Sequence, residues 1–143
     1  MDSETGKVVA MASYPNYDPS HFSDFEPGSY KNPNVANLFE PGSIFKVLIM
    51  AAALNENLVT PDTRCDICSG PITIGQFTIK TWNEEYSHDS TMTDVIIHSD
   101  NIGMVFVGKK LGKEKFARYL SDFGFGQLTG IQLQDEASGA QKS

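Results

Sequence analysis

A run of eight apolar residues, Val47–Leu54, follows soon after a Pro41-Gly42 break and most constrains how this chain can fold. Proline and glycine interrupt helices, so the break predicts a helix that begins at about Ser43 and ends near Asn57. Because the run is apolar on every face, we expect this helix to be buried at the centre of a domain. Its first turn carries two reactive side chains, Ser43 and Lys46.

The spacing of Ser43 and Lys46 is typical of a serine nucleophile and its base. Residues three apart lie on one helix face, about a turn from each other, so the lysine nitrogen can reach the serine oxygen. Unpaired N–H groups in the first turn favour negative charge developing near the serine. An apolar environment disfavours an ammonium ion and so favours a neutral amine that can accept the serine proton. Taken alone, this S-x-x-K tetrapeptide also fits an ordinary surface helix.

The rest of the sequence predicts an α+β chain. We expect a strand over residues 6–13, a short hairpin around Gly75 within residues 72–79, and an ordered irregular loop over residues 20–40. A capping box at Thr91–Asp94 predicts a short helix that ends near His98. Two further helices are expected over residues 102–111 and 113–123, with Gly112 as the C-cap of the first.

A second short motif, Ser99-Asp100-Asn101, lies in the predicted loop between two of these helices. The hydroxyl of Ser99 can relay a proton between Lys46 and a leaving group. The amide of Asn101 can hold both Lys46 and a substrate carbonyl. Serine, aspartate and asparagine are also the ordinary residues of helix junctions, so the motif alone fits a helix cap.

Composition narrows the classes of function. The 143 residues predict one structural unit, and a net charge of -7 argues against a nucleic-acid partner. The eight-residue apolar run is far shorter than the roughly 20 residues that cross a bilayer. Residues 1–6 are polar and lack the features of a signal peptide, so we expect any membrane anchor to lie outside this sequence.

Cys65 and Cys68 have the spacing of a metal or redox motif. A structural zinc site needs four ligands, and the three histidines show no paired spacing, so we expect neither a metal nor a cofactor. A redox motif would lie at a junction of strand and helix, whereas these cysteines lie in a predicted loop. We interpret them as loop cysteines that are either free or joined by a local disulfide.

Taken together and in this order, the two motifs resemble those of a class B penicillin-binding protein, a peptidoglycan D,D-transpeptidase. The resemblance covers nearly all of the chain, and Glu40 before Pro41-Gly42-Ser43 favours class B over class A. The segments that carry it are residues 2–19, 34–36, 39–46, 99–104 and 123–131.

The resemblance implies an acyl transfer in which Ser43, Lys46, Ser99 and Asn101 are catalytic. Ser43 would attack the carbonyl of a D-Ala-D-Ala stem peptide, Lys46 would accept its proton, and Ser99 would help to protonate the leaving D-alanine. Ser43, through its backbone N–H, and Asn101 would also bind the substrate. An amine of a neighbouring stem peptide would then take the acyl group, whereas a β-lactam would remain on Ser43.

The third motif of the family, Lys-Thr-Gly or Lys-Ser-Gly, is absent from this sequence. Lys80-Thr81-Trp82 carries two of its three letters, but it precedes Ser99 when the motif should follow. Residues 1–143 are therefore expected to be part of a transpeptidase domain of the penicillin-binding-protein and β-lactamase-like fold. That part would hold the first sheet strand and the helical subdomain, without the later strands, and would be nearly inactive alone.

The resemblance also implies a context and leaves alternatives open. The parent protein is expected to be membrane-anchored, to work on the extracytoplasmic face of a bacterial membrane, and to meet other cell-wall synthesis proteins. One alternative is a β-lactam sensor or serine β-lactamase, although no deacylating carboxylate is identifiable. Another is a degenerate, non-catalytic module that binds a cell-wall partner.

Overall fold

The computed structural model describes residues 1–139, which form two compact units. One unit comprises residues 40–123, and the other comprises residues 1–39 together with the described residues from Gly124 on. In chain order the elements are the 3₁₀ helices η1 (Pro19–Asp24) and η2 (Pro27–Tyr30), helix α1 (Pro33–Ala36), 3₁₀ helix η3 (Gly42–Ile44), helix α2 (Phe45–Asn55), strands β1 (Ile72–Ile74) and β2 (Phe77–Ile79), and helices α3 (Met92–Ile97) and α4 (Asn101–Asp122).

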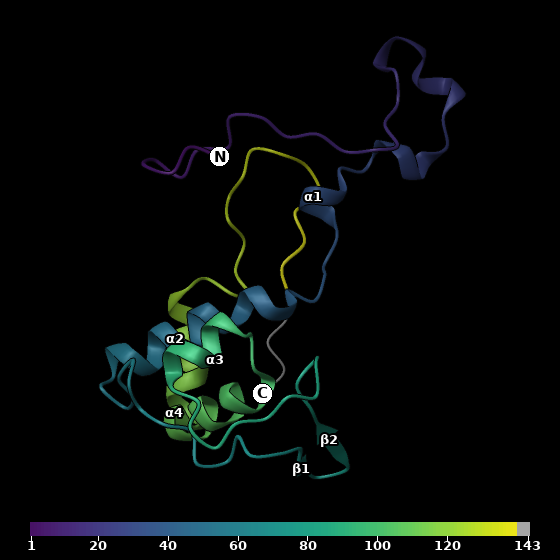
Figure 1. Ribbon diagram of the computed structural model, residues 1–143. Helices are drawn as coiled ribbons and strands as arrows, with labels where there is room; N and C mark the ends of the chain where they lie inside the picture. Colours follow the sequence, from purple (N-terminus) through teal and green to yellow (C-terminus); the bar gives the residue numbers. More distant parts are fainter. Residues whose placement is uncertain (140–143) are drawn as a thin grey trace. The chain divides into compact units, whose positions relative to one another are not determined.

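Helices α2, α3 and α4 gather around the core of the unit formed by residues 40–123 (Figure 1). Helix α4 packs against both α2 and α3, and the loops between α2 and α3 close the sides. The buried side chains of this core are Ile49, Met50, Ala52, Ala53, Val59, Cys65, Cys68, Met92, Val95, Ile102, Phe106, Val107 and Leu111. The mixture of helices with a small antiparallel sheet confirms the predicted α+β class.

Helix α2 begins as the proline-glycine break predicts, but burial on every face is wrong. Its buried face contributes Ile49, Met50, Ala52 and Ala53 to the core. Val47 is 58% exposed, and Ile44 in the preceding turn is 71% exposed. The reason is that α4 covers only one side of this helix in the part of the chain the structure describes. An apolar stripe on the opposite side is left in contact with solvent.

The junction of α3 and α4 is built by local side-chain contacts and close packing. The Thr91 hydroxyl accepts the Asp94 N–H and the Asp94 carboxylate accepts the Thr91 N–H, which confirms the capping box. Gly103 lies directly against Val95, where a Cβ atom would come within 2.2 Å of a valine methyl group. Gly112 has a left-handed φ of 76° and interrupts α4 where the C-cap was predicted.

The loop between α2 and α3 contains the predicted hairpin and a disulfide. Strands β1 and β2 pair antiparallel, with Ile72 opposite Ile79, and Gly75 takes a left-handed φ of 60° in the turn. Cys65 and Cys68 are buried and joined to each other, which is one of the two states expected from the sequence. In residues 1–139, no group of three or more histidine, cysteine, aspartate or glutamate side chains could hold a metal ion.

Glu56 ties the end of α2 to the second half of α4. Its carboxylate contacts Lys115 Nζ at 2.5 Å, accepts a hydrogen bond from Tyr119 at 3.0 Å, and pairs with Arg118. The hydrogen bonds from Lys115 and then Tyr119 lower the pKa of Glu56 to about 2. The carboxylate therefore favours the folded state over the unfolded state at neutral pH.

This ion cluster predicts a specific loss of stability in acid. Because the folded-state pKa is depressed, the contribution of Glu56 is complete above the ordinary glutamate pKa of about 4.3 and is lost as the pH falls towards about 2. We therefore expect the wild-type chain to have a higher melting temperature than Glu56→Gln above that interval, and the difference should shrink as the pH falls through it. Thermal unfolding followed by circular dichroism measures this difference. Glu114→Gln, at an exposed glutamate of α4, is the matched control and should leave the pH dependence unchanged.

The other unit consists of extended chain and short turns. The strand predicted over residues 6–13 is not formed, because that stretch has no strand partner among the described residues. Gly6 and Lys7 form backbone hydrogen bonds with Asp2, and Asn34 Nδ2 donates to the Ala12 carbonyl at 3.0 Å. Residues 20–36 fold into η1, η2 and α1, and the rings of Phe25 and Tyr30 each meet Tyr17 edge to face. No helix of the described residues has the length and hydropathy needed to span a bilayer.

Candidate active site

The amine of Lys46 is the centre of a polar cluster in the unit formed by residues 40–123. Lys46 lies in the first turn of α2 and is half-buried. Its Nζ donates to the Ser99 carbonyl at 2.6 Å, to Ser99 Oγ at 3.0 Å and to Asn101 Oδ1 at 2.6 Å. An ammonium group has three hydrogens, so these three acceptors use all of them. The structure therefore joins three of the four predicted catalytic residues.

Burial and charge act on Lys46 in opposite directions. Partial burial disfavours the ammonium form and lowers the pKa of Lys46, and the nearby carboxylate of Asp100 partly opposes that shift. Burial has the larger effect, so a proton leaves this amine more readily than it leaves an ordinary lysine. This is the electrostatic condition that a lysine base requires.

Ser99 occupies the position of a Schellman motif in which glycine is usual. Its N–H donates to the Ile96 carbonyl at 3.2 Å, and the Asp100 N–H donates to the Val95 carbonyl at 2.9 Å. These two bonds close the end of α3 and require a left-handed residue between them. Ser99 has a φ of 53°, which costs a residue with a Cβ atom about 1 kcal/mol. Its carbonyl and its hydroxyl both contact Lys46 from this strained position.

The strain at Ser99 predicts an unusual order of stabilities for two substitutions. Ser99→Ala and Ser99→Gly both remove the hydroxyl that contacts Lys46, but only glycine relieves the left-handed φ. We expect the glycine variant to be more stable than the alanine variant by about 1 kcal/mol in chemical denaturation. The same pair of substitutions at Ser90, which has no left-handed φ, should not favour glycine. Equal stability of the two Ser99 variants would show that the backbone is not strained there.

Asp100 and Asn101 hold the start of α4 in place. The Asp100 carboxylate accepts the Ile102 N–H at 2.7 Å and caps the helix, which is the structural role considered for this motif. Asn101 uses both ends of its amide, because Nδ2 donates to the Lys80 carbonyl at 2.7 Å while Oδ1 faces Lys46. The capping and the lysine-binding interpretations of the motif are therefore compatible, since different atoms serve them.

Ser43 is exposed and lies one turn before Lys46. It belongs to η3, which continues directly into α2, and the left-handed φ of 60° at Gly42 brings the chain into this turn. Within residues 1–139 its hydroxyl makes no hydrogen bond to Lys46, whose Nζ is occupied by Ser99 and Asn101. Ser43 is thus accessible to a ligand, and contact with the amine would require Lys46 to release one acceptor.

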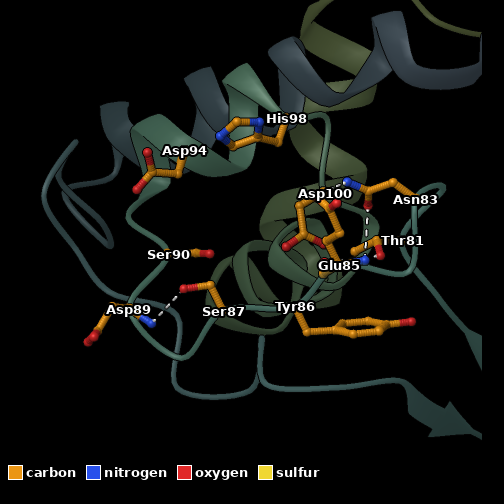
Figure 2. A pocket seen from close by; sticks show the side chains of 10 residues that line it. All are labelled: Thr81, Asn83, Glu85, Tyr86, Ser87, Asp89, Ser90, Asp94, His98 and Asp100. Atoms are coloured by element: carbon orange, nitrogen blue, oxygen red, sulfur yellow. Dashed lines mark hydrogen bonds between the residues drawn. The ribbon is translucent and has the colours of Figure 1, made fainter.

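The Lys80 carbonyl is a component of the site that the motifs do not reveal. It contacts Asn101 across a separation of 21 residues, and a backbone carbonyl has no sequence signature. Next to the site lies a polar cavity of about 450 Å³, whose wall includes Asp100 (Figure 2). The residues that line it are Thr81, Asn83, Glu85, Tyr86, Ser87, Asp89, Ser90, Asp94, His98 and Asp100.

Together these features define a class of site: an accessible serine on a helix, a half-buried lysine one turn on, and a serine and an asparagine that hold the lysine. Residues 1–143 match the family model of the penicillin binding protein transpeptidase domain, and the chain belongs to that family.

Individual relatives agree with the family. The chain is 36% identical over 140 residues to Stage V sporulation protein D of Bacillus subtilis, covering 97% of this chain and 22% of that protein. It is 30% identical over 139 residues to peptidoglycan D,D-transpeptidase FtsI of Escherichia coli K12, covering 97% of this chain and 23% of that protein. The chain therefore spans less than a quarter of the length of these curated relatives.

Solved structures show the same fold. Penicillin binding protein 3 of Mycobacterium tuberculosis in its apo form matches with a TM-score of 0.72 and 32% identity, over 78% of this chain and 25% of that chain. The same protein has also been solved in complexes with aztreonam and with ampicillin. These matches confirm a partial transpeptidase fold, as the sequence predicted.

Proposed function

We propose that residues 1–143 form part of a transpeptidase domain and supply the acyl-transfer residues of a class B peptidoglycan D,D-transpeptidase. The observation that carries the proposal is the contact of Lys46 Nζ with Ser99 and Asn101 in a chain of this family. The name of one relative, peptidoglycan D,D-transpeptidase FtsI, supports it over a β-lactamase or a sensor. The substrates would be D-Ala-D-Ala stem peptides, and β-lactams would acylate the same serine.

In the first step, Ser43 Oγ attacks the carbonyl carbon of the penultimate D-alanine, and its proton passes to the neutral amine of Lys46. Before that transfer, the neutral amine has one hydrogen fewer to donate than the ammonium form, so one acceptor must be released and the lone pair can face Ser43. The longest of its three bonds, the 3.0 Å bond to Ser99 Oγ, is the one we expect to rearrange. Ser99 can then donate its own proton to the leaving D-alanine and recover one from Lys46.

In the second step, the amine of a neighbouring stem peptide attacks the ester carbonyl, a proton returns to Ser43 Oγ, and the cross-link is released. The backbone N–H of Ser43 would stabilise the oxyanion in both steps, and Asn101 would hold the substrate carbonyl. The family further supports a membrane-anchored parent whose catalytic domain works on the extracytoplasmic face, alongside other cell-wall synthesis proteins. No metal ion or cofactor takes part in this scheme.

The test is a chimera in which this chain replaces the matched 140 residues of Stage V sporulation protein D. The rest of that relative is expected to supply the family's Lys-Thr-Gly or Lys-Ser-Gly motif, which this sequence lacks. After incubation with fluorescent penicillin, we expect one adduct per molecule, mapped by mass spectrometry to Ser43. No adduct from a folded chimera would refute the proposed function.

The isolated chain should react with penicillin far more slowly than the chimera. It lacks the cationic motif for the substrate carboxylate and a second oxyanion donor, and one such donor is worth about 10²- to 10³-fold in rate. The comparison is the second-order acylation rate constant, measured by intact mass for both proteins. A rapid stoichiometric adduct on the isolated chain would contradict this prediction.

A further inference from the structure

The segment Lys80-Thr81-Trp82 contacts the same corner of the fold that holds Lys46. It follows β2 and meets the junction between α3 and α4 at two points. The Lys80 carbonyl accepts the Asn101 Nδ2 hydrogen bond at 2.7 Å, and Trp82 Nε1 donates to the His98 carbonyl at 3.2 Å. The two bonds therefore lie on either side of Ser99 in the sequence.

The first of these contacts determines which end of the Asn101 amide faces Lys46. A carbonyl can only accept, so the Lys80 carbonyl selects the NH₂ end of the amide. The oxygen end is then left for the Lys46 ammonium, which can only donate. Rotating the amide by half a turn would place its NH₂ group against the Lys46 ammonium and its oxygen against the Lys80 carbonyl. Neither contact could then be a hydrogen bond, so Lys80 and Lys46 together fix the orientation of the amide.

The second contact restrains the residue immediately before Ser99. Trp82 is 77% exposed, so little packing holds its ring, and its indole N–H donates to the His98 carbonyl. Thr81 anchors the middle of the segment, because it is only 6% exposed and its hydroxyl donates to the Glu85 carbonyl at 3.3 Å. Thr81 and Glu85 also line the cavity beside the site (Figure 2).

We propose that Lys80-Thr81-Trp82 is a strap that positions Ser99 and Asn101 on Lys46, and that Trp82 is a positioning residue for the acyl transfer. The inference rests on the proposed function and adds to it a role for a segment that resembles the third family motif only in its first two letters. Trp82 would act on the chemical step and not on the binding of the ligand. It would do so through the His98 carbonyl and the left-handed turn at Ser99.

The first test uses Trp82→Phe, which keeps an aromatic ring and removes the N–H donor. In the chimera, we expect the first-order acylation step with penicillin to slow by about three- to tenfold, the range for one lost hydrogen bond. The apparent dissociation constant of penicillin should not change. Thr81→Val should have the same effect on the chemical step. Phe77→Leu and Thr93→Val, at an exposed ring and at a threonine bonded to another carbonyl, are matched controls that should react at the wild-type rate.

The second test does not depend on activity. Trp82 is the single tryptophan of the chain, so one indole N–H resonance reports its bond in a ¹⁵N spectrum. That N–H should exchange more slowly than a free indole, and Trp82→Phe should shift the side-chain NH₂ resonances of Asn101. An unprotected indole and an unmoved Asn101 would overturn the strap. So would a Trp82→Phe chimera that reacts at the wild-type rate.

The outcomes separate the two proposals. If the wild-type chimera forms no adduct at Ser43, the proposed function fails, and the spectra of the isolated chain still decide whether the strap holds Asn101. If the wild-type chimera reacts and the Trp82→Phe chimera reacts equally fast, the function stands and the strap is refuted. If the Trp82→Phe variant weakens penicillin binding while leaving the chemical step unchanged, Trp82 is a binding residue and the positioning role is refuted.

Discussion

Ser43→Ala is expected to abolish covalent labelling of the chimera by penicillin. In the proposed mechanism Ser43 is the one nucleophile that the enzyme supplies, and without its oxygen no acyl-enzyme can form. We expect the acylation rate to fall by at least about 10³-fold, as is typical when a nucleophile is removed. The fold should survive, because Ser43 is exposed and contributes nothing to the core. Labelling is measured by gel fluorescence and by intact mass over a range of penicillin concentrations.

The matched control for this experiment is Ser23→Ala, at another exposed serine in a 3₁₀ helix. It should be labelled at the wild-type rate and to one adduct per molecule. A Ser43→Ala chimera that still gains a penicillin adduct at a defined residue would show that another side chain is the nucleophile. Peptide mapping would then identify that residue.

Lys46→Arg and Lys46→Met should each slow acylation by about 10²- to 10⁴-fold, the usual contribution of a general base. The arginine variant separates two roles, because a guanidinium can still donate to Ser99 and Asn101 but cannot become a neutral base. The methionine variant removes the donors as well and should also lower the melting temperature. Lys109→Met, at an exposed lysine of α4, is the control and should change neither quantity.

The pH profile gives an independent check on Lys46. The neutral amine is the active form, so the acylation rate should rise with pH through the pKa of Lys46 and then level off. Because burial lowers that pKa, the rise should come at lower pH than it would for an ordinary lysine. A Lys46→Arg chimera that reacts at the wild-type rate, or a wild-type rate that falls with pH over this range, would refute the role of Lys46 as the base.

Features of the fold that depend on neighbours in sequence could be predicted from the sequence. The capping box at Thr91–Asp94, the hairpin turn at Gly75 and the interruption of α4 at Gly112 each involve residues a few positions apart. The approach of Lys46 to Ser99 spans 53 residues, and no periodicity predicts it. The resemblance to a family, carried by several ordered segments, is what brought these residues together.

Features that depend on distant partners could not be predicted. The apolar residues Val8–Met11 suit a strand, but a strand needs a neighbour, and none pairs with residues 6–13 among the described residues. The apolar run of α2 indicated that this helix is buried, but the sequence alone does not show how many sides of the helix other elements cover. The left-handed φ of Ser99 could not be predicted from the sequence either, because glycine is the residue that usually indicates such a turn.

All three acceptors of Lys46 come from Ser99 and Asn101, at the single corner where α3 meets α4. Among residues 1–139 these are the hydrogen-bond acceptors of the amine, so a displacement of that corner would break all three bonds together. A compound that bound between this corner and α2 could therefore inactivate the site without resembling a peptide or a β-lactam. Such a compound would act by displacing the junction between α3 and α4 and not by occupying the position of the substrate.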